Sequence, residues 1–240
     1  MNRLIEKAAK FNIELSQEQL WQFQTYYEML VETNKVMNLT AITELDEVIT
    51  KHFLDSLALA GAYPDICNSD VELKVLDLGT GAGFPGLPLK LAFPHLRITL
   101  MDSLNKRVKF LQSVIDKLEL CGIDAVHGRA EEAARNKAYR EQFDLCVSRA
   151  VANLSTLSEY CIPFVKLQGK LISYKAADIE DEASIAGKAI RVMGGNLNAI
   201  KKITLPESDI ERSFVIIDKI KSTPKAYPRK AGTASKEPIK

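Results

Sequence analysis

Four glycines in a twelve-residue run give this chain its clearest candidate for chemistry. The run, residues 75–86, reads Val-Leu-Asp-Leu-Gly-Thr-Gly-Ala-Gly-Phe-Pro-Gly, which predicts a buried strand that breaks into a loop. Glycine tolerates left-handed backbone angles and lets the main chain approach a ligand closely. Helix-compatible residues follow at 87–93, and a second apolar strand, 97–102, ends in Asp102. This order of strand, glycine loop, helix, strand and acid is typical of a nucleotide-binding βαβ unit.

The glycines by themselves leave the class of nucleotide open. Residues 81–86 satisfy the pattern G-x-G-x-x-G, and Asp102 stands where a dinucleotide enzyme places its ribose-binding acid. Asp77, however, lies inside the apolar run, where an unpaired charge is costly, so we expect it to meet a cation. S-adenosylmethionine carries an ammonium and a sulfonium, whereas this carboxylate would repel the pyrophosphate of NAD. Asp77 therefore favours S-adenosylmethionine as the cofactor, with a plain strand-to-helix turn capped by an aspartate as the alternative.

Further polar residues stand at the ends of later predicted strands. Asp102 is placed to accept hydrogen bonds from both ribose hydroxyls of the donor, with a helix N-cap as the alternative. Glu131 is a candidate contact to adenine, or a first-turn acid of a plain helix. Arg149 is the candidate catalytic residue, because its guanidinium can hold the donor carboxylate or an RNA phosphate; a surface salt bridge is equally open. Tyr174 and Lys175 could stack on a base and contact a phosphate, or end an ordinary strand.

The motifs that are absent narrow the reaction. The end of the predicted strand 143–149 lacks an Asn-Pro-Pro-Tyr type sequence, which would hold an exocyclic amine, and the chain shows no Pro-Cys nucleophile motif there. The three histidines, at 52, 95 and 127, are too scattered for a proton relay. A ring nitrogen such as guanine N7 has a free lone pair, so its methylation requires positioning rather than a general base. A ring nitrogen therefore suits this set of residues.

Alternating strand and helix signals from residue 74 onward predict a largely parallel sheet that is covered on both faces. The strands are expected near 74–79, 97–102, 123–127, 143–149 and 169–175, and after a helix near 178–193 come two more, 196–205 and 212–220. The last two should form an antiparallel hairpin. The fold class is thus α/β: a Rossmann-like class I methyltransferase with a mostly parallel seven-stranded sheet and an N-terminal helical extension. Its ligand is expected at the carboxyl ends of the strands.

The first 66 residues carry helical spacing without strand alternation. Apolar residues share a predicted helix face at positions 4, 5, 8, 20, 23, 27, 30 and 31. Ser16 and Gln19 resemble a capping box, and a further helical stretch is expected from 44 to 62. We expect three parts: a helical cap (1–66), an S-adenosylmethionine-dependent methyltransferase domain (67–220) and a basic C-terminal tail (221–240).

The composition is that of an ordinary globular protein: 240 residues, 46% hydrophobic, 26% charged, with a net charge of +1. No stretch approaches the roughly 20 apolar residues that cross a bilayer, and the N-terminus lacks the apolar core of a secretory signal, so a cytoplasmic protein without a membrane partner is expected. The four cysteines show no C-x-x-C spacing, which favours free thiols over metal ligands. We expect no metal, and a monomer.

Charge is concentrated at the C-terminus. Residues 219–240 hold seven Lys or Arg against a single acid, Glu237. A basic tail of this kind can contact phosphates, or it can be a solvated terminus rich in lysine, proline and serine. Its composition alone favours the solvated terminus.

Five motifs, taken in order, span nearly the whole chain. They are Asn38-Leu-Thr, His52-Phe-Leu-Asp-Ser-Leu57, the glycine run from Asp77 to Gly86, Ser148-Arg-Ala-Val-Ala152 and Tyr227-Pro-Arg-Lys-Ala-Gly232. Together they resemble the RsmG family, also called glucose-inhibited division protein B. The resemblance implies transfer of a methyl group from S-adenosylmethionine to N7 of a guanine in 16S rRNA, with 16S rRNA or the small ribosomal subunit as the partner.

The resemblance also implies particular site residues. The implied donor contacts are Gly79, Phe84, Asp102, Ser103, Leu104, Ala130, Glu131 and Arg149. Reasoning from the residues adds Asp77 and Gly81 in the glycine loop. The candidate RNA contacts are Asn38, His52, Lys175, Arg229 and Lys230. The resemblance places Asn38, Thr40, His52 and Asp55 at the cleft, although a polar patch that holds the cap to the sheet would explain these four almost as well.

Two other classes of function stay open at this point. A methyltransferase that acts on a small molecule would keep the fold and dispense with the basic tail. An NAD-dependent reductase or a non-catalytic nucleotide sensor would have to accommodate Asp77 beside a pyrophosphate.

Overall fold

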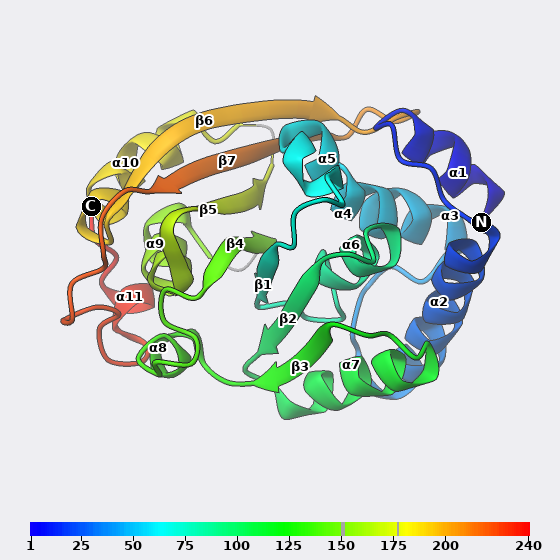
Figure 1. Cartoon of the computed structure of the whole chain (residues 1–240), viewed down its shortest axis with the longest axis horizontal. Helices are drawn as coiled ribbons and strands as arrows, with labels where there is room; N and C mark the ends of the chain where they lie inside the picture. The colour runs from blue at the N-terminus through cyan, green and yellow to red at the C-terminus, as the bar shows by residue number, and fades with distance from the viewer. Residues whose placement is uncertain (150–151, 177) are drawn as a thin grey trace.

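A seven-stranded sheet forms the centre of the computed structural model, which describes residues 1–149, 152–176 and 178–240. The strand order is β3-β2-β1-β4-β5-β7-β6 (Figure 1). β1 to β5 run parallel, and β7 lies antiparallel between β5 and β6. The strands are β1 (Lys74–Leu78), β2 (Arg97–Asp102), β3 (Ile123–His127), β4 (Phe143–Arg149), β5 (Val165–Lys175), β6 (Gly195–Thr204) and β7 (Glu211–Lys219). The predicted fold class, including the terminal hairpin, is confirmed.

β5 is the strand whose predicted start, residue 169, differs most from the structure. It begins at Val165, pairs with Phe143, and shifts register before Lys170 pairs with Leu145. Within the shift Gln168 adopts a positive φ of 68°. A bulge of this kind adds residues to one strand and breaks the alternation on which a strand prediction depends.

The helices connect and cover these strands. They are α1 (Asn2–Ala9), α2 (Gln17–Met37), α3 (Leu45–Val48), the π-helix η1 (Ile49–Leu54), α4 (Asp55–Leu57), α5 (Leu59–Ala62), η2 (Pro64–Cys67), α6 (Gly86–Ala92), α7 (Asn105–Lys117), α8 (Ala130–Ala133), α9 (Leu154–Cys161), η3 (Ile162–Phe164), α10 (Glu180–Val192) and α11 (Thr233–Lys236). Among the described helices, none is long and apolar enough to cross a membrane.

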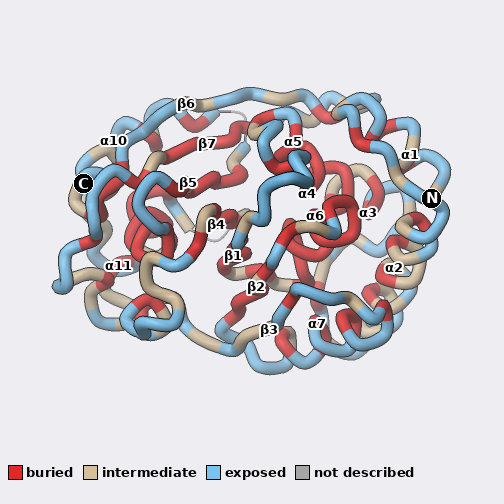
Figure 2. Tube along the Cα trace, viewed as in Figure 1, coloured by how far each residue is buried: buried red, intermediate tan, exposed pale blue. Residues whose placement is uncertain are grey.

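Successive side chains of each strand point to opposite faces of the sheet and so divide between two apolar clusters. Val75 joins the larger cluster, to which α1 to α7 contribute, whereas Leu76 joins the smaller one, with α9 and α10. Burial of both faces explains the near-continuous apolar runs of the parallel strands. Figure 2 shows the buried residues following the sheet and the helix sides that face it. The N-terminal helices therefore pack into the same core as the sheet.

α2 is the longest helix and is fixed at both ends. Ser16 and Gln19 form the predicted capping box, with each side chain accepting a hydrogen bond from the other's backbone. The Gln19 amide also donates to the Leu91 carbonyl at 2.8 Å, which joins α2 to α6. At its C-terminal end Asn38 adopts the left-handed conformation that stops the helix.

The buried face of α2 differs by one residue from the prediction. Tyr26 is fully buried, whereas Tyr27, the predicted residue, is half-buried. The Tyr26 hydroxyl donates to the carbonyl of Ala82 in the glycine loop at 2.7 Å. A buried hydroxyl needs a hydrogen-bond partner, and the Ala82 carbonyl is the partner of the Tyr26 hydroxyl. This bond links α2 to the glycine loop.

We predict that Tyr26→Phe lowers the free energy of unfolding by about 1–2 kcal/mol, because the Ala82 carbonyl loses its buried donor. Chemical denaturation of the purified variant measures this. Tyr27→Phe is the matched control, since its hydroxyl donates to the Thr43 carbonyl at the surface, and it should change the free energy by less than about 0.5 kcal/mol. Equal losses in both variants would contradict the assignment.

Candidate functional site

Two pockets open at the edge of the sheet where the parallel strands end. The chain runs from β1 outward to β3 and then returns to β4 on the other side of β1, which leaves a crevice at the carboxyl ends of these neighbours. The glycine-loop pocket, ≈ 340 Å³, is lined by Leu78, Gly79, Met101, Asp102, Ser103, Leu104, Gly128, Arg129, Ala130, Glu131, Tyr160 and Gly232. The arginine pocket, ≈ 590 Å³, is lined by Ile42, Lys51, His52, Asp55, Arg149, Tyr174, Lys175, Ala176, Ile210 and Arg212.

Asp77 holds the glycine loop from beneath. Its Oδ2 accepts hydrogen bonds from the Thr80 hydroxyl at 2.6 Å and from the Gly86 N–H at 2.8 Å. A Cβ on Gly86 would lie 2.8 Å from that same oxygen and 2.3 Å from Leu100 Cδ2, so only glycine fits there. Gly81, like Gly79 and Gly83, has a positive φ. The loop therefore owes its shape to the residues of its own motif.

The Asp77 side chain is fully buried, and its Oδ1 has no hydrogen-bond partner among the described residues. Burial raises the pKa of Asp77 to about 6, although the hydrogen bonds from Thr80 and Gly86 and the charge of Arg149 oppose the rise. In the structure Asp77 therefore stabilises the conformation of the glycine loop. Direct contact between Asp77 and a bound cation stays a prediction.

Asp102 ties the glycine loop to the start of α7. Its Oδ2 accepts from the Gly81 N–H at 2.9 Å and its Oδ1 from the Leu104 N–H at 2.9 Å. A carboxylate has further lone pairs to offer, so these bonds leave it able to accept from a ligand in the pocket. Leu104, 43% exposed, adds an apolar surface beside the acid. A polar acceptor next to apolar surface suits a nucleoside.

Glu131 forms the far side of this pocket with two residues that the sequence did not predict. Its Oε1 accepts from the Gly232 N–H at 2.9 Å. Tyr160, on α9, also lines the pocket, and burial, together with the nearby charges of Glu131 and Glu159, raises its pKa. Gly232 ends the Tyr227–Gly232 motif, but neither it nor Tyr160 carries a sequence signal for this pocket, because only the tertiary fold brings them to the end of β3.

The arginine pocket is built around one buried carboxylate. Asp55 accepts from Arg149 at 2.8 Å through Oδ2 and from Arg212 at 2.7 Å through Oδ1. The Arg149 guanidinium also lies 5.1 Å from the centre of the Phe84 ring, a cation–π distance. Asp55 therefore fixes two guanidinium groups at the ends of β4 and β7. The sequence did not predict Arg212, which reads only as the first residue of a strand.

His52 completes the contact between the pocket and the glycine loop. Its ring stacks on Phe84 with a centroid distance of 4.4 Å, and its Nε2 lies 2.8 Å from the Thr40 hydroxyl. Burial, and then the charge of Arg149, lower the pKa of His52 to about 4. His52 is consequently a neutral aromatic group at neutral pH, placed by the π-helical turn η1.

The candidate residues predicted from the sequence fall into four groups. The glycine-loop pocket contains Gly79, Asp102, Ser103, Leu104, Ala130 and Glu131, and the arginine pocket contains His52, Arg149 and Lys175. Asp77, Gly81 and Phe84 build the loop between them. Asn38, Arg229 and Lys230 line neither pocket. Arg149, which was expected among the donor contacts, lines the arginine pocket, where Asp55 holds it, and its contact with the donor stays a prediction.

Two of the candidate RNA contacts form ion pairs within the fold, and two others are exposed. Lys175 pairs with Glu182 at 2.7 Å and donates to the Ala152 carbonyl. Arg229 pairs with Glu159 at 2.7 Å. Asn38 is the exposed cap of α2, and Lys230 is exposed in the C-terminal segment. Their contact with RNA stays a prediction.

No group of three or more His, Cys, Asp or Glu side chains that could hold a metal ion occurs in the described parts of the chain. The four cysteines are free, two of them buried and two exposed. Ala150 and Val151, within the Ser148–Ala152 motif, lie outside the described residues.

The chain matches one protein-family model and is similar to bacterial proteins of one name. The model is GidB, described as rRNA small subunit methyltransferase G, and it matches residues 19–212. The ribosomal RNA small subunit methyltransferase G of Lachnoclostridium phytofermentans is 50% identical over 235 residues, which cover 98% of this chain and 96% of the relative. The protein of that name from Limosilactobacillus reuteri is 50% identical over 232 residues, covering 96% and 95%.

A solved structure supports the fold. A mutant of MtNAS in complex with S-adenosylmethionine has a TM-score of 0.55 to this chain at 13% sequence identity, covering 92% of this chain and 89% of the other. At so low an identity the likeness concerns the fold alone.

We predict that Asp77→Asn changes how stability depends on pH. Because burial raises the pKa of Asp77 from 3.8 to about 6, the folded state binds a proton more tightly than the unfolded chain. The stability that comes from this proton is present below pH 4 and is lost as the pH rises to about 6. Asparagine cannot titrate, so the wild type should lose about 1–3 kcal/mol relative to the variant across that interval. Denaturation series at closely spaced pH values measure this, and parallel curves would contradict the prediction.

Proposed function

The chain belongs to the GidB family of rRNA small subunit methyltransferases, and we propose that it transfers a methyl group from S-adenosylmethionine to N7 of a guanine in 16S rRNA. Membership makes it an S-adenosylmethionine-dependent rRNA methyltransferase. The choice of N7 and of 16S rRNA follows from the motif resemblance. One observation carries the proposal: the glycine-loop pocket and the cation-rich arginine pocket open on the same edge of the sheet, and Phe84 joins them.

We assign the donor to the glycine-loop pocket. Its residues fit an adenosine group, because Asp102 has unused lone pairs and Leu104 offers an exposed apolar surface. The unpartnered oxygen of Asp77 beneath the loop fits a cationic ligand as well. The proposed donor contacts are Gly79, Asp102, Ser103, Leu104, Ala130 and Glu131, on a loop shaped by Asp77, Gly81 and Phe84.

We assign the target nucleotide to the arginine pocket. Lys51, Arg149, Lys175 and Arg212 line it, against the buried carboxylate of Asp55. Guanidinium and ammonium groups at one opening suit phosphate oxygens. Arg149 is the proposed catalytic residue, because it lies against Phe84 at the boundary with the donor loop.

The chemistry asks for positioning rather than for proton transfer. S-adenosylmethionine supplies a methyl group on a positively charged sulfur. Guanine N7 has a free lone pair, so no side chain has to remove a proton before it reacts. His52 is buried and neutral, in keeping with a reaction that needs no general base. Its stacking on Phe84 fixes the arginine pocket relative to the glycine loop.

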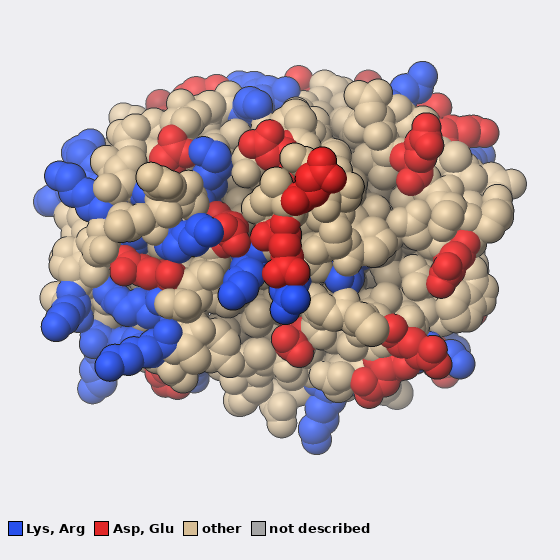
Figure 3. Space-filling model, in the orientation of Figure 1, with Lys and Arg blue, Asp and Glu red and all other residues tan. Residues whose placement is uncertain are grey.

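Exposed cations extend this face beyond the pockets. Figure 3 shows Lys and Arg gathered over the C-terminal segment and α8, with Asp and Glu more frequent at the opposite end. The exposed Lys and Arg of the C-terminal segment and of the chain around α8 are Arg129, Arg135, Lys137, Lys221, Lys225, Lys230, Lys236 and Lys240. Such a surface beside the donor pocket is suited to an RNA backbone.

We further propose that the enzyme acts as a monomer, without a metal ion, and in the cytoplasm, where ribosomal subunits are assembled. Methyl transfer to a ring nitrogen needs no activated water, so the proposed reaction calls for no metal ion. We also retain the division into a cap (1–66), a methyltransferase domain (67–220) and a basic C-terminal segment (221–240).

The proposal predicts where the label goes. Purified small ribosomal subunits and protein-free 16S rRNA are each incubated with the enzyme and donor labelled in the methyl group, and the modified nucleotide is mapped. We expect the label on N7 of one guanine. Label on another atom, or on no RNA, would refute the assignment.

Variants of the two pockets should separate donor binding from RNA binding. Asp102→Ala should weaken S-adenosylmethionine binding, measured by calorimetry, by about tenfold or more, because it removes a charged acceptor. Lys51→Ala and Arg212→Ala should leave that affinity unchanged and raise the KM for RNA, because they remove phosphate contacts. The opposite pattern would exchange the roles of the pockets.

A further inference from the structure

The C-terminal segment is packed against the protein rather than extended from it. After β7 the chain turns back past α9 and forms the short helix α11 near α8, before it reaches a C-terminus that lies beside α10 (Figure 1). We call residues 221–237 the C-terminal strap. Its lysines are exposed, yet its main chain is held at several points. The strap therefore presents its lysines to solvent on one side and binds the protein through its main chain on the other.

The central anchor of the strap is an ion pair between Arg229 and Glu159. The Arg229 guanidinium donates to Glu159 Oε2 at 2.7 Å, and the Arg229 backbone N–H donates to Glu159 Oε1 at 2.7 Å. The Glu159 side chain is 1% exposed. A carboxylate buried to this degree depends on its partner, so the anchor fixes the strap firmly to α9.

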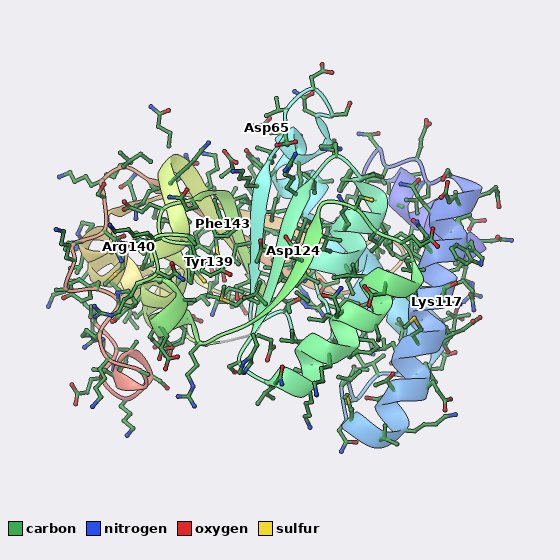
Figure 4. All side chains as sticks on the ribbon, turned by 60° about the horizontal axis from the view of Figure 1, so that its bottom comes forward. Asp65, Lys117, Asp124, Tyr139, Arg140 and Phe143 are labelled. Carbon is green, nitrogen blue, oxygen red and sulfur yellow. The ribbon has the colours of Figure 1, made fainter. Side chains whose placement is uncertain are left out.

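Further bonds hold the strap on either side of this anchor. Arg140 donates to the carbonyls of Thr223 at 2.8 Å and Tyr227 at 2.9 Å. Figure 4 shows Arg140 on the flank of the molecule along which the strap runs. The Thr156 hydroxyl donates to the Ala234 carbonyl at 3.0 Å, a buried bond that fixes α11 on α9.

The strap reaches the glycine-loop pocket through Gly232. This residue lines the pocket, and its N–H donates to Glu131, which lines it too. Gly232 has a φ of +83°, and a Cβ there would meet no heavy atom within 4 Å, so it faces open space. Only two residues, Lys230 and Ala231, separate it from Arg229. The anchor and the pocket wall are thus parts of one short piece of chain.

We propose that the C-terminal strap is a wall of the donor pocket, and that Arg229 and Glu159 are positioning residues for S-adenosylmethionine binding. The inference rests on the proposed function, which assigns the donor to this pocket. Loss of the anchor releases the Gly232 backbone, removes the partner of Glu131 and opens the pocket to water. By thermodynamic reciprocity, bound donor must in turn favour the docked strap.

Calorimetry with S-adenosylmethionine and S-adenosylhomocysteine tests the proposal. Arg229→Ala and Glu159→Gln should each weaken the binding of both ligands by about tenfold, while Arg229→Lys, which keeps the charge, should retain part of the affinity. Lys170→Ala is the matched control, since it removes a half-buried ion pair with Asp218 away from the pocket, and its affinity should equal that of the wild type. Unchanged affinity in both anchor variants would overturn the proposal.

Limited proteolysis of the wild-type protein gives a test that needs no substitution. Trypsin cleavage after Lys225 and Lys230 should slow when S-adenosylhomocysteine is saturating, and unchanged cleavage would count against the strap. Asp102→Ala separates the two levels of the argument. If that variant binds the donor normally, the pocket assignment itself is wrong; if it loses the donor while the anchor variants keep it, only the strap proposal fails.

Discussion

The buried carboxylate of Asp77 is the constraint on which the rest of the site depends. By accepting from Thr80 and from the Gly86 N–H, it sets the path of the glycine loop and the point at which α6 begins. The loop then offers its Gly81 N–H to Asp102 and its Ala82 carbonyl to Tyr26 of α2. The N-terminal helices and the sheet are thereby joined at the donor loop. A charge beneath the loop is costly to bury, and the raised pKa of Asp77 measures that cost.

A second buried carboxylate, Asp55, organises the other half of the crevice, and its hydrogen-bond donors are charged rather than neutral. Asp77 accepts from neutral donors and shapes a backbone, whereas Asp55 accepts from two guanidinium groups and holds both at the arginine pocket. Phe84 lies between the two arrangements, under His52 and Arg149. Phe84 therefore joins the glycine loop to the arginine pocket through one aromatic ring.

Local sequence was sufficient for the sheet and for the loop, because apolar runs and glycines act over a few residues. Local sequence was insufficient for the start of β5, where a bulge interrupts the strand. It also placed Tyr27 rather than Tyr26 on the buried face of α2, an error of one position along the helix. The lining of the glycine-loop pocket was predicted only in part. Asp102 and Glu131 follow predicted strands and could be found, whereas Gly232 lies about a hundred residues further along the chain. The contact of Arg229 with RNA stays a prediction. Its ion pair with Glu159 could not be predicted, because Glu159 lies on another element, far from Arg229 in the sequence.

The docked C-terminal strap changes how a shortened form of this enzyme has to be interpreted. An enzyme that ends before residue 221 would lose exposed lysines and a wall of the donor pocket in the same cut. Its failure to methylate RNA would look like a defect in substrate recognition, although the missing step is retention of the methyl donor.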